Sequence, residues 1–120
     1  MSILGKEAIL EEIKKGTIKV EPFNEKMLGP ASIDLHLSNA FRVFVALPDA
    51  LNMTADLDFK AATKGLVIPE GGTLTVQPGQ TVLGITQEKV TLGDGISGWL
   101  EGRSRCYRTR IPRHSIFRRF

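Results

Sequence analysis

Residues 29–44 read GPASIDLHLSNAFRVF, and this stretch decides the class of fold. Ile33, Leu35 and Leu37 recur at every second position with polar residues between them. Successive side chains of a β-strand point to opposite faces, so this period predicts a strand with one buried face. That strand is SIDLHLS, residues 32–38, and a second apolar run, FRVFVAL at residues 41–47, predicts another strand after it.

The N-terminal segment SILGKEAILEEIKKG has a different period and predicts the chain's helix. Ile9, Leu10 and Ile13 form an apolar stripe, acidic residues precede the two lysines, and Ser2 is placed to cap the first turn. Gly16 is predicted to end this helix.

Short strands separated by Pro-Gly and Gly-Gly turns account for most of the remaining chain. We expect them in TIKVEPF (17–23), LVIPEGG (66–72), TLTVQPGQ (73–80), TVLGITQEKVTL (81–92) and GDGISGWLEGR (93–103). Residues 48–65 show no clean periodicity and predict an excursion over the surface. Many short strands with regular turns indicate a β-barrel or sandwich with one N-terminal helix.

The amino-acid composition limits the kinds of protein that this chain can be. The chain has 120 residues, of which 42% are apolar and 24% charged, as expected for one globular domain. Cys106 is the single cysteine, which excludes an intrachain disulfide and suits a reducing compartment. The sequence contains no run of eighteen apolar residues and no signal-peptide pattern. We therefore expect a cytoplasmic protein that makes no use of a membrane.

The charges are divided unequally along the chain. Residues 1–100 carry nine basic side chains against twelve acidic ones, whereas residues 101–120 carry seven arginines against Glu101. The tail could contact nucleic-acid phosphates and stack aromatic rings on bases. The acidic body offers no continuous basic face, so we do not expect nucleic acid as a partner.

Several kinds of catalytic site are excluded by residue type and spacing. His36 and His114 are the only histidines, and Cys106 has no cysteine at ligand spacing, so no metal site, zinc included, is expected. No P-loop or Gly-x-Gly-x-x-Gly segment occurs. Ser104, His114 and Asp34 could be combined into a triad, but nothing in their spacing supports one.

Three other features have a functional and a structural interpretation. Gly102, Arg103 and Ser104 follow a predicted strand, where backbone amides, a guanidinium and a hydroxyl can bind an oxyanion, although such a tripeptide is common in solvated loops. Asp34 could be catalytic, but its place inside an alternating strand favours a hydrogen-bonded structural acid. Trp99 favours a core or interface position over a stacking platform.

Taken together, several of these stretches resemble the dCTP deaminase branch of the dUTPase-like superfamily. They are the opening helix, GTIKVEPF, GPASIDLHLSNAFRVF, IPEGG, PGQTVLGITQEKVTL and GWLEGRSR, in the family's order. The resemblance implies a distorted β-barrel of jelly-roll type over residues 1–108, assembled as a homotrimer. It also implies deoxypyrimidine triphosphates (dCTP, dUTP or dTTP) as ligands, with Mg²⁺ carried on the nucleotide and no zinc.

The resemblance assigns roles to four residues. Arg103 and Ser104 match the signature loop that grips the triphosphate, and the serine also helps to place the catalytic water. Arg105 stands where a second serine is usual, so its backbone amide could serve without the hydroxyl. Arg108 matches an arginine that supports the catalytic site.

Residues 109–120 depart from the family's pattern. The family continues with a Leu-Gly pair, a Pro-Gly turn and a strand with the catalytic glutamate, whereas no acidic residue follows Glu101 here. Loss of a general acid/base costs about 10²–10⁴ in rate, so we expect the chain as written to be catalytically impaired. A slip of the reading frame would account for the arginine-rich ending. Two alternatives stay open: dUTP diphosphatase activity, alone or joined to deamination, and a non-catalytic nucleotide-binding homologue.

Overall fold

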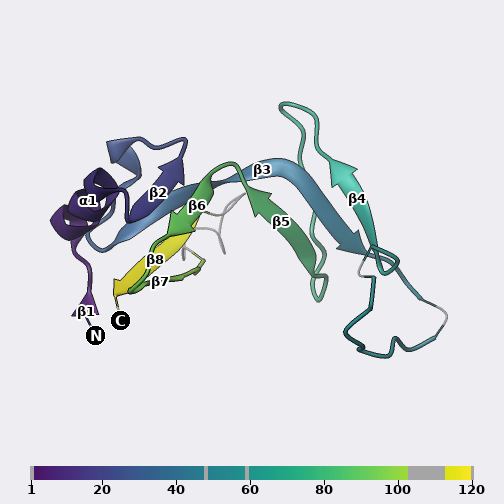
Figure 1. Cartoon of the computed structure of the whole chain (residues 1–120). Helices are drawn as coiled ribbons and strands as arrows, with labels where there is room; N and C mark the ends of the chain where they lie inside the picture. Colours follow the sequence, from purple (N-terminus) through teal and green to yellow (C-terminus); the bar gives the residue numbers. More distant parts are fainter. Residues whose placement is uncertain (1, 48, 59, 103–112, 120) are drawn as a thin grey trace. The chain divides into compact units, whose positions relative to one another are not determined.

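The computed structural model describes residues 2–47, 49–58, 60–102 and 113–119, the last of these as backbone alone (Figure 1). Its α-helix is α1 (Lys6–Lys15), and a single 3-10 turn, η1, spans Glu25–Met27. The strands are β1 (Ser2–Ile3), β2 (Ile18–Glu21), β3 (Ser32–Phe44), β4 (Thr63–Val67), β5 (Val82–Thr86), β6 (Lys89–Leu92), β7 (Ile96–Trp99) and β8 (Arg113–Arg119). The prediction of a mainly β chain with an N-terminal helix is confirmed.

The strands form two sheets. One has the order β1-β8-β3-β4, with β5 also paired to β3 and β7 to β8, and the other pairs β2 with β6. Contacts divide the chain into two compact units: unit 1 is Met1–Leu37 with Thr86–Phe120, and unit 2 is Ser38–Ile85. Strand β3 passes from one unit into the other, so the two predicted strands of residues 32–47 are one continuous strand as far as Phe44. The predicted barrel closure stays a prediction.

Helix α1 ends for a local reason, whereas its beginning depends on a distant strand. Gly16 adopts φ +81°, its N–H donates to the Ile13 carbonyl, and the N–H of Thr17 donates to the Glu12 carbonyl. This pair of bonds is a Schellman ending, which requires the left-handed conformation that glycine adopts without strain. The predicted Ser2 cap is wrong. Gly5 is the N-cap, without a side-chain bond, because Ser2 and Ile3 extend to pair with β8.

The core of unit 1 lies between α1 and the strands that follow it. Ile9, Ile18 and Ile33 have no exposed surface, and Leu35 is almost fully buried. The helical stripe and the first two apolar residues of the period-two pattern, Ile33 and Leu35, therefore face this core, as predicted, whereas Leu37 is only half-buried. Strand β2 carries its buried residues opposite β6 in antiparallel register, with Ile18 paired to Leu92.

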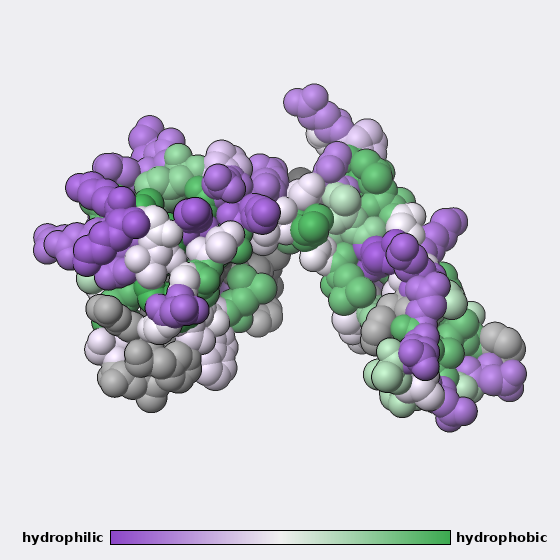
Figure 2. All heavy atoms as spheres, in the orientation of Figure 1, coloured by the Kyte–Doolittle hydropathy of each residue, from purple (hydrophilic) through white to green (hydrophobic). Residues whose placement is uncertain are grey.

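Unit 2 buries very little of its apolar surface. Within its described residues only Ala62 and Thr63 are buried, and Arg42 of β3 donates from Nε to the Thr63 hydroxyl at 2.8 Å. Apolar side chains instead gather at the surface of this unit (Figure 2). The large exposed ones are Phe44, Val45, Leu47, Leu51, Met53, Leu66, Val67, Val76, Leu83 and Ile85.

Three further expectations differ from the structure. Strand β4 spans Thr63–Val67, so it begins inside the predicted surface excursion of residues 48–65 and includes only the first two residues of the predicted strand 66–72. The segment 73–80 forms no strand; it contains only a turn, with Gly79 at φ +81°. No strand in the described part of the chain pairs with this alternating segment, and Val76 is exposed. Trp99 ends β7 and is 59% exposed, so a place in the core of this chain is wrong and the interface alternative stays open.

Candidate functional site

The residues predicted to hold a triphosphate lie outside the described part of the chain. These are Arg103, Ser104, Arg105 and Arg108. The structure does describe the strand that leads toward them: β7 is paired with β8, and Glu101 and Gly102 follow it with exposed surface. The strand that was predicted to precede the Gly-Arg-Ser segment is therefore present as β7, and the described chain continues to Gly102.

Asp34 lies at the centre of the first half of β3, half-buried, on the face opposite Ile33 and Leu35. It lines a pocket of unit 1, and it has at least one interaction partner. Its predicted role as a structural acid stays a prediction.

The same pocket contains a pair that the sequence did not point to, His36 and Glu88. One carboxylate oxygen of Glu88 accepts the backbone N–H of His36 at 2.8 Å, and the other lies 2.6 Å from Nδ1 of the same residue. The Glu88 side chain is only 2% exposed, whereas that of His36 is 36% exposed. A carboxylate that is hydrogen-bonded to both the backbone and the ring of one histidine fixes the orientation of that ring.

The charge on Glu88 is stabilised by this arrangement. Burial, the largest influence, acts to raise the pKa of Glu88 because it penalises the charged form. Hydrogen bonds from the His36 backbone and ring and from the backbone of Glu88, together with the charge of His36, outweigh burial. The pKa of Glu88 therefore lies below its ordinary value of 4.5, and the carboxylate is ionised near neutral pH.

Neighbouring hydrogen bonds extend the pair into a clasp between β3 and the connection from β5 to β6. The Gln87 N–H donates to the His36 carbonyl at 2.8 Å, and Gln87 Nε2 donates to the Leu37 carbonyl at 3.0 Å. The Thr86 hydroxyl donates to the Glu88 carbonyl at 2.8 Å. We call Thr86–Glu88, with His36 and Leu37, the β3 clasp.

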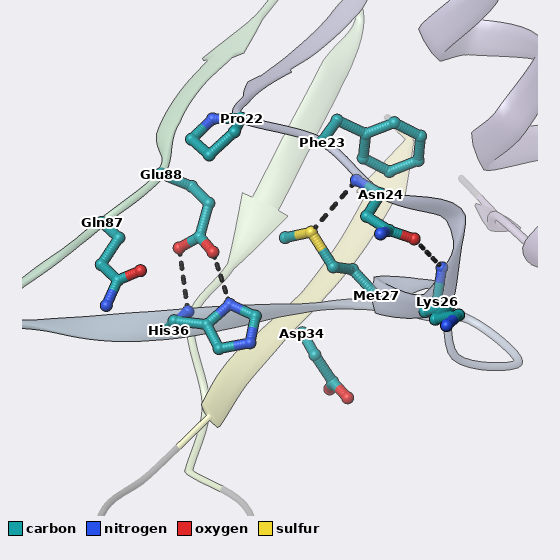
Figure 3. Close-up of a pocket in the computed structure, with 9 residues that line it drawn as sticks. All are labelled: Pro22, Phe23, Asn24, Lys26, Met27, Asp34, His36, Gln87 and Glu88. Atoms are coloured by element: carbon teal, nitrogen blue, oxygen red, sulfur yellow. Dashed lines mark hydrogen bonds and ion pairs between the residues drawn. The ribbon is translucent and has the colours of Figure 1, made fainter.

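The pocket beside the clasp has a volume of about 470 Å³ and lies entirely within unit 1 (Figure 3). Its wall is built from three segments of the chain. The segment after β2 contributes Pro22, Phe23, Asn24, Lys26 and Met27, strand β3 contributes Asp34 and His36, and the β5–β6 connection contributes Gln87 and Glu88. This volume is within the usual range of small-molecule pockets.

One signal in the sequence could have revealed Glu88. It falls in phase with Val90 and Leu92, the two residues of β6 that pack against the core. An acid at an inward-facing position of a strand needs a buried partner. That partner is His36, 52 positions away in the sequence, and the residue spacing alone does not identify it.

Two features of the described residues bear on function. No group of three or more histidine, cysteine, aspartate or glutamate side chains in this part of the chain could hold a metal ion. No helix within it is long and apolar enough to cross a membrane.

The sequence matches the model of the family described as dCTP deaminase-like over residues 3–118. The chain belongs to the dCTP deaminase-like family. Similar proteins include the dCTP deaminase of Thermomicrobium roseum, 37% identical over 116 residues, and the dCTP deaminase of Marinomonas sp., 34% identical over 114 residues. The dCTP deaminase, dUMP-forming, of Salinispora tropica is 35% identical over 117 residues.

These three alignments cover 88–94% of this dCTP deaminase-like chain and 58–59% of the relatives. The chain thus spans about three fifths of the length of the curated relatives that it matches. The family match extends past Arg108 and includes most of the arginine-rich tail.

Proposed function

We propose that this chain acts in deoxypyrimidine nucleotide metabolism by binding dCTP and contributing to its deamination to dUTP and ammonia. The observation that carries the proposal is the family match over residues 3–118, together with relatives named dCTP deaminase. Overall, water adds its oxygen at C4 of the cytosine ring, the C4–N bond breaks, and the amino group leaves as ammonia.

We assign the triphosphate to Arg103, Ser104 and the backbone amide of Arg105. A triphosphate carries about four negative charges, and guanidinium groups bind phosphate oxygens in a bidentate manner without losing their own charge. Mg²⁺ would arrive with the nucleotide as part of the substrate. Ser104 would help to place the attacking water, and Arg108 would support the catalytic site.

We further propose that catalysis by a polypeptide of these 120 residues is weak. No carboxylate side chain occurs in residues 102–120, and deamination needs a group that takes a proton from water and passes it to the leaving ammonia. Binding of dCTP without turnover would identify a nucleotide-binding homologue instead. Turnover at the rate of a full-length relative would contradict the impairment.

A second activity, cleavage of dUTP to dUMP and pyrophosphate, is favoured by one observation. The Salinispora tropica relative is named a dUMP-forming dCTP deaminase. Parallel assays of dCTP and dUTP with Mg²⁺ distinguish the possibilities: ammonia alone indicates deamination, pyrophosphate alone indicates a diphosphatase, and both indicate the combined activity. Neither product and no binding of either nucleotide would refute the proposed function.

We propose a homotrimer of jelly-roll barrels as the working assembly. The apolar surface of unit 2 supports this, because ten large exposed side chains on a segment of 48 residues need cover from other polypeptide. Light scattering after gel filtration should give three times the 13.2 kDa chain mass. A monomer at all concentrations would contradict it.

A further inference from the structure

We propose that unit 2 opens and closes as a separate cooperative segment while unit 1 stays folded, and that the β3 clasp is the boundary at which this opening stops. Three features of the described chain support this: the place of the clasp along the sequence, its anchor in unit 1, and the low burial in unit 2. None of them involves the nucleotide or the reaction.

The β3 clasp lies at both points where the chain passes between the units. The chain enters unit 2 after Leu37 and returns to unit 1 at Thr86. The clasp residues are the last two before the first crossing and the first three after the second, and all five belong to unit 1. A loss of structure that spreads along the chain from unit 2 therefore reaches the clasp before it reaches the rest of unit 1.

Four hydrogen bonds join the chain segments at the two crossings. Glu88 accepts the His36 backbone N–H at 2.8 Å and lies 2.6 Å from Nδ1 of the ring (Figure 3). Gln87 donates its backbone N–H to the His36 carbonyl at 2.8 Å and its side-chain N–H to the Leu37 carbonyl at 3.0 Å. When one of these bonds breaks, the other three hold the segments together, so the clasp opens only when several break at once.

The clasp is anchored in the core of unit 1. The Glu88 side chain is only 2% exposed, and Val90 and Leu92, which follow it on β6, pack against that core. Leu35, which precedes His36 on β3, is buried in the same core. Opening of the clasp would therefore disturb buried structure of unit 1, and this makes it a costly step.

Unit 2 has no comparable core among its described residues. Only Ala62 and Thr63 are buried there, whereas Ile9, Ile18 and Ile33 of unit 1 have no exposed surface. Burial of apolar side chains is the main favourable term in folding, so unit 2 loses much less stability than unit 1 when it opens. Segments of low stability commonly open as contiguous units, on the timescale that hydrogen exchange reports.

The closed form of unit 2 is nevertheless defined by backbone hydrogen bonds of ordinary length. The Val45 N–H donates to the Ala62 carbonyl at 3.1 Å, and the Ile68 N–H donates to the Asn39 carbonyl at 2.9 Å. Each such bond adds little net stability, because water bonds to the same groups in the open chain. These bonds therefore specify how unit 2 closes without keeping it closed.

Native-state hydrogen exchange of the full chain, followed by ¹⁵N NMR without nucleotide, tests the separate opening. Val45 and Ile68 report on unit 2. Ile9 and Gly93 report on unit 1, where their N–H groups donate to backbone carbonyls at 2.9 and 2.7 Å. All four amides are hydrogen-bonded, so a difference in protection measures opening. We expect the two amides of unit 2 to be protected at least about 100-fold less than the two of unit 1.

The Gln87 amide tests whether the opening stops at the clasp. In the wild type it should be protected to within about threefold of Ile9. Glu88→Ala removes two clasp bonds, and the protection of Gln87 relative to that of Ile9 should then fall at least about tenfold. Glu11→Ala removes an exposed carboxylate of unit 1 and should leave this ratio unchanged.

Gln87→Ala is the milder second variant, because the Gln87 side chain is exposed and its loss removes only the bond to Leu37. The amide at position 87 should then lose about two- to tenfold in protection relative to Ile9. If Glu88→Ala does not fold, this variant decides the question, and unchanged protection at position 87 would refute the role of the clasp.

Three further results would overturn the proposal. They are equal protection of the reporters in both units, a wild-type Gln87 amide protected only as weakly as Val45 and Ile68, and a folded Glu88→Ala chain in which Gln87 keeps its protection relative to Ile9. The proposed function is tested separately, because the exchange is measured without nucleotide. A chain that neither binds nor deaminates dCTP would leave the exchange result standing, and equal protection would leave the proposed chemistry standing.

Discussion

Replacing Glu88 with glutamine tests whether the β3 clasp stabilises unit 1. The carboxylate is 2% exposed and accepts two hydrogen bonds from one residue, His36, at 2.6 and 2.8 Å. Glutamine has nearly the same shape and can still accept the backbone N–H through its amide oxygen. The bond to the ring loses its charged acceptor, and the negative charge is lost.

The expected cost follows from the bond that is changed. A hydrogen bond to a charged group contributes about 1.5–3 kcal/mol, and one of two such bonds is lost or weakened. We therefore expect Glu88→Gln to lower the free energy of unfolding by about 1.5–3 kcal/mol at pH 7. Glu88→Ala removes both bonds and leaves the partly buried His36 N–H without this acceptor, so a loss of about 3–5 kcal/mol is expected.

Urea unfolding followed by circular dichroism measures both values, with Glu70→Gln as the control. Glu70 is an exposed acid of unit 2, and its substitution should change the free energy of unfolding by less than about 0.5 kcal/mol. The pKa of Glu88 is lower in the folded chain than in the unfolded chain, so the unfolded state binds more protons as the pH falls. The advantage of the wild type over Glu88→Gln should be complete above about pH 4.5 and should disappear as the pH falls through the lowered pKa.

Two results would refute this reasoning. One is a Glu88→Gln variant whose stability at pH 7 matches that of Glu70→Gln. The other is a difference between wild type and Glu88→Gln that stays constant from pH 7 to about pH 3, because a constant difference would mean that Glu88 has the same pKa in the folded and the unfolded chain.

Three other outcomes are expected. Gly16→Ala should destabilise the chain by about 1 kcal/mol in thermal unfolding, because φ is +81° there; an unchanged midpoint would exclude the Schellman ending. Ile33→Ala should cost about 2–5 kcal/mol in urea unfolding, since the side chain is fully buried; a cost near zero would mean that the unit 1 core is not formed in solution. Arg103→Ala should weaken dCTP binding at least tenfold in calorimetry while leaving the urea midpoint unchanged, and equal affinity would remove Arg103 from the triphosphate site.

Local patterns anticipated much of unit 1. Helix α1 and the stop at Gly16 follow from a 3.6-residue period and one glycine, and both are found. Strand β3 follows from the alternation around Ile33 and Leu35. The helix prediction succeeds because the interactions that decide it join residues close in sequence. The strand prediction succeeds because it depends only on which face is buried.

Expectations that depended on distant parts of the chain were less successful. Ser2 was expected to cap the helix, but it pairs with Arg119 of β8 at the other end of the sequence. An alternating segment such as 73–80 has the pattern of a strand but becomes one only if another strand pairs with it, and no strand of the described residues does.

The sequence by itself determined the mainly β class, the helix, the buried face of β3 and the family resemblance. Each of these depends on patterns of residue types within short stretches of the chain. Only the tertiary structure decided that His36 and Glu88 meet, that the clasp closes one side of a pocket, and that unit 2 leaves its apolar side chains exposed. The physical reason is that a hydrogen bond between residues 36 and 88 depends on how β3 passes the β5–β6 connection, and the packing of the whole unit sets that path.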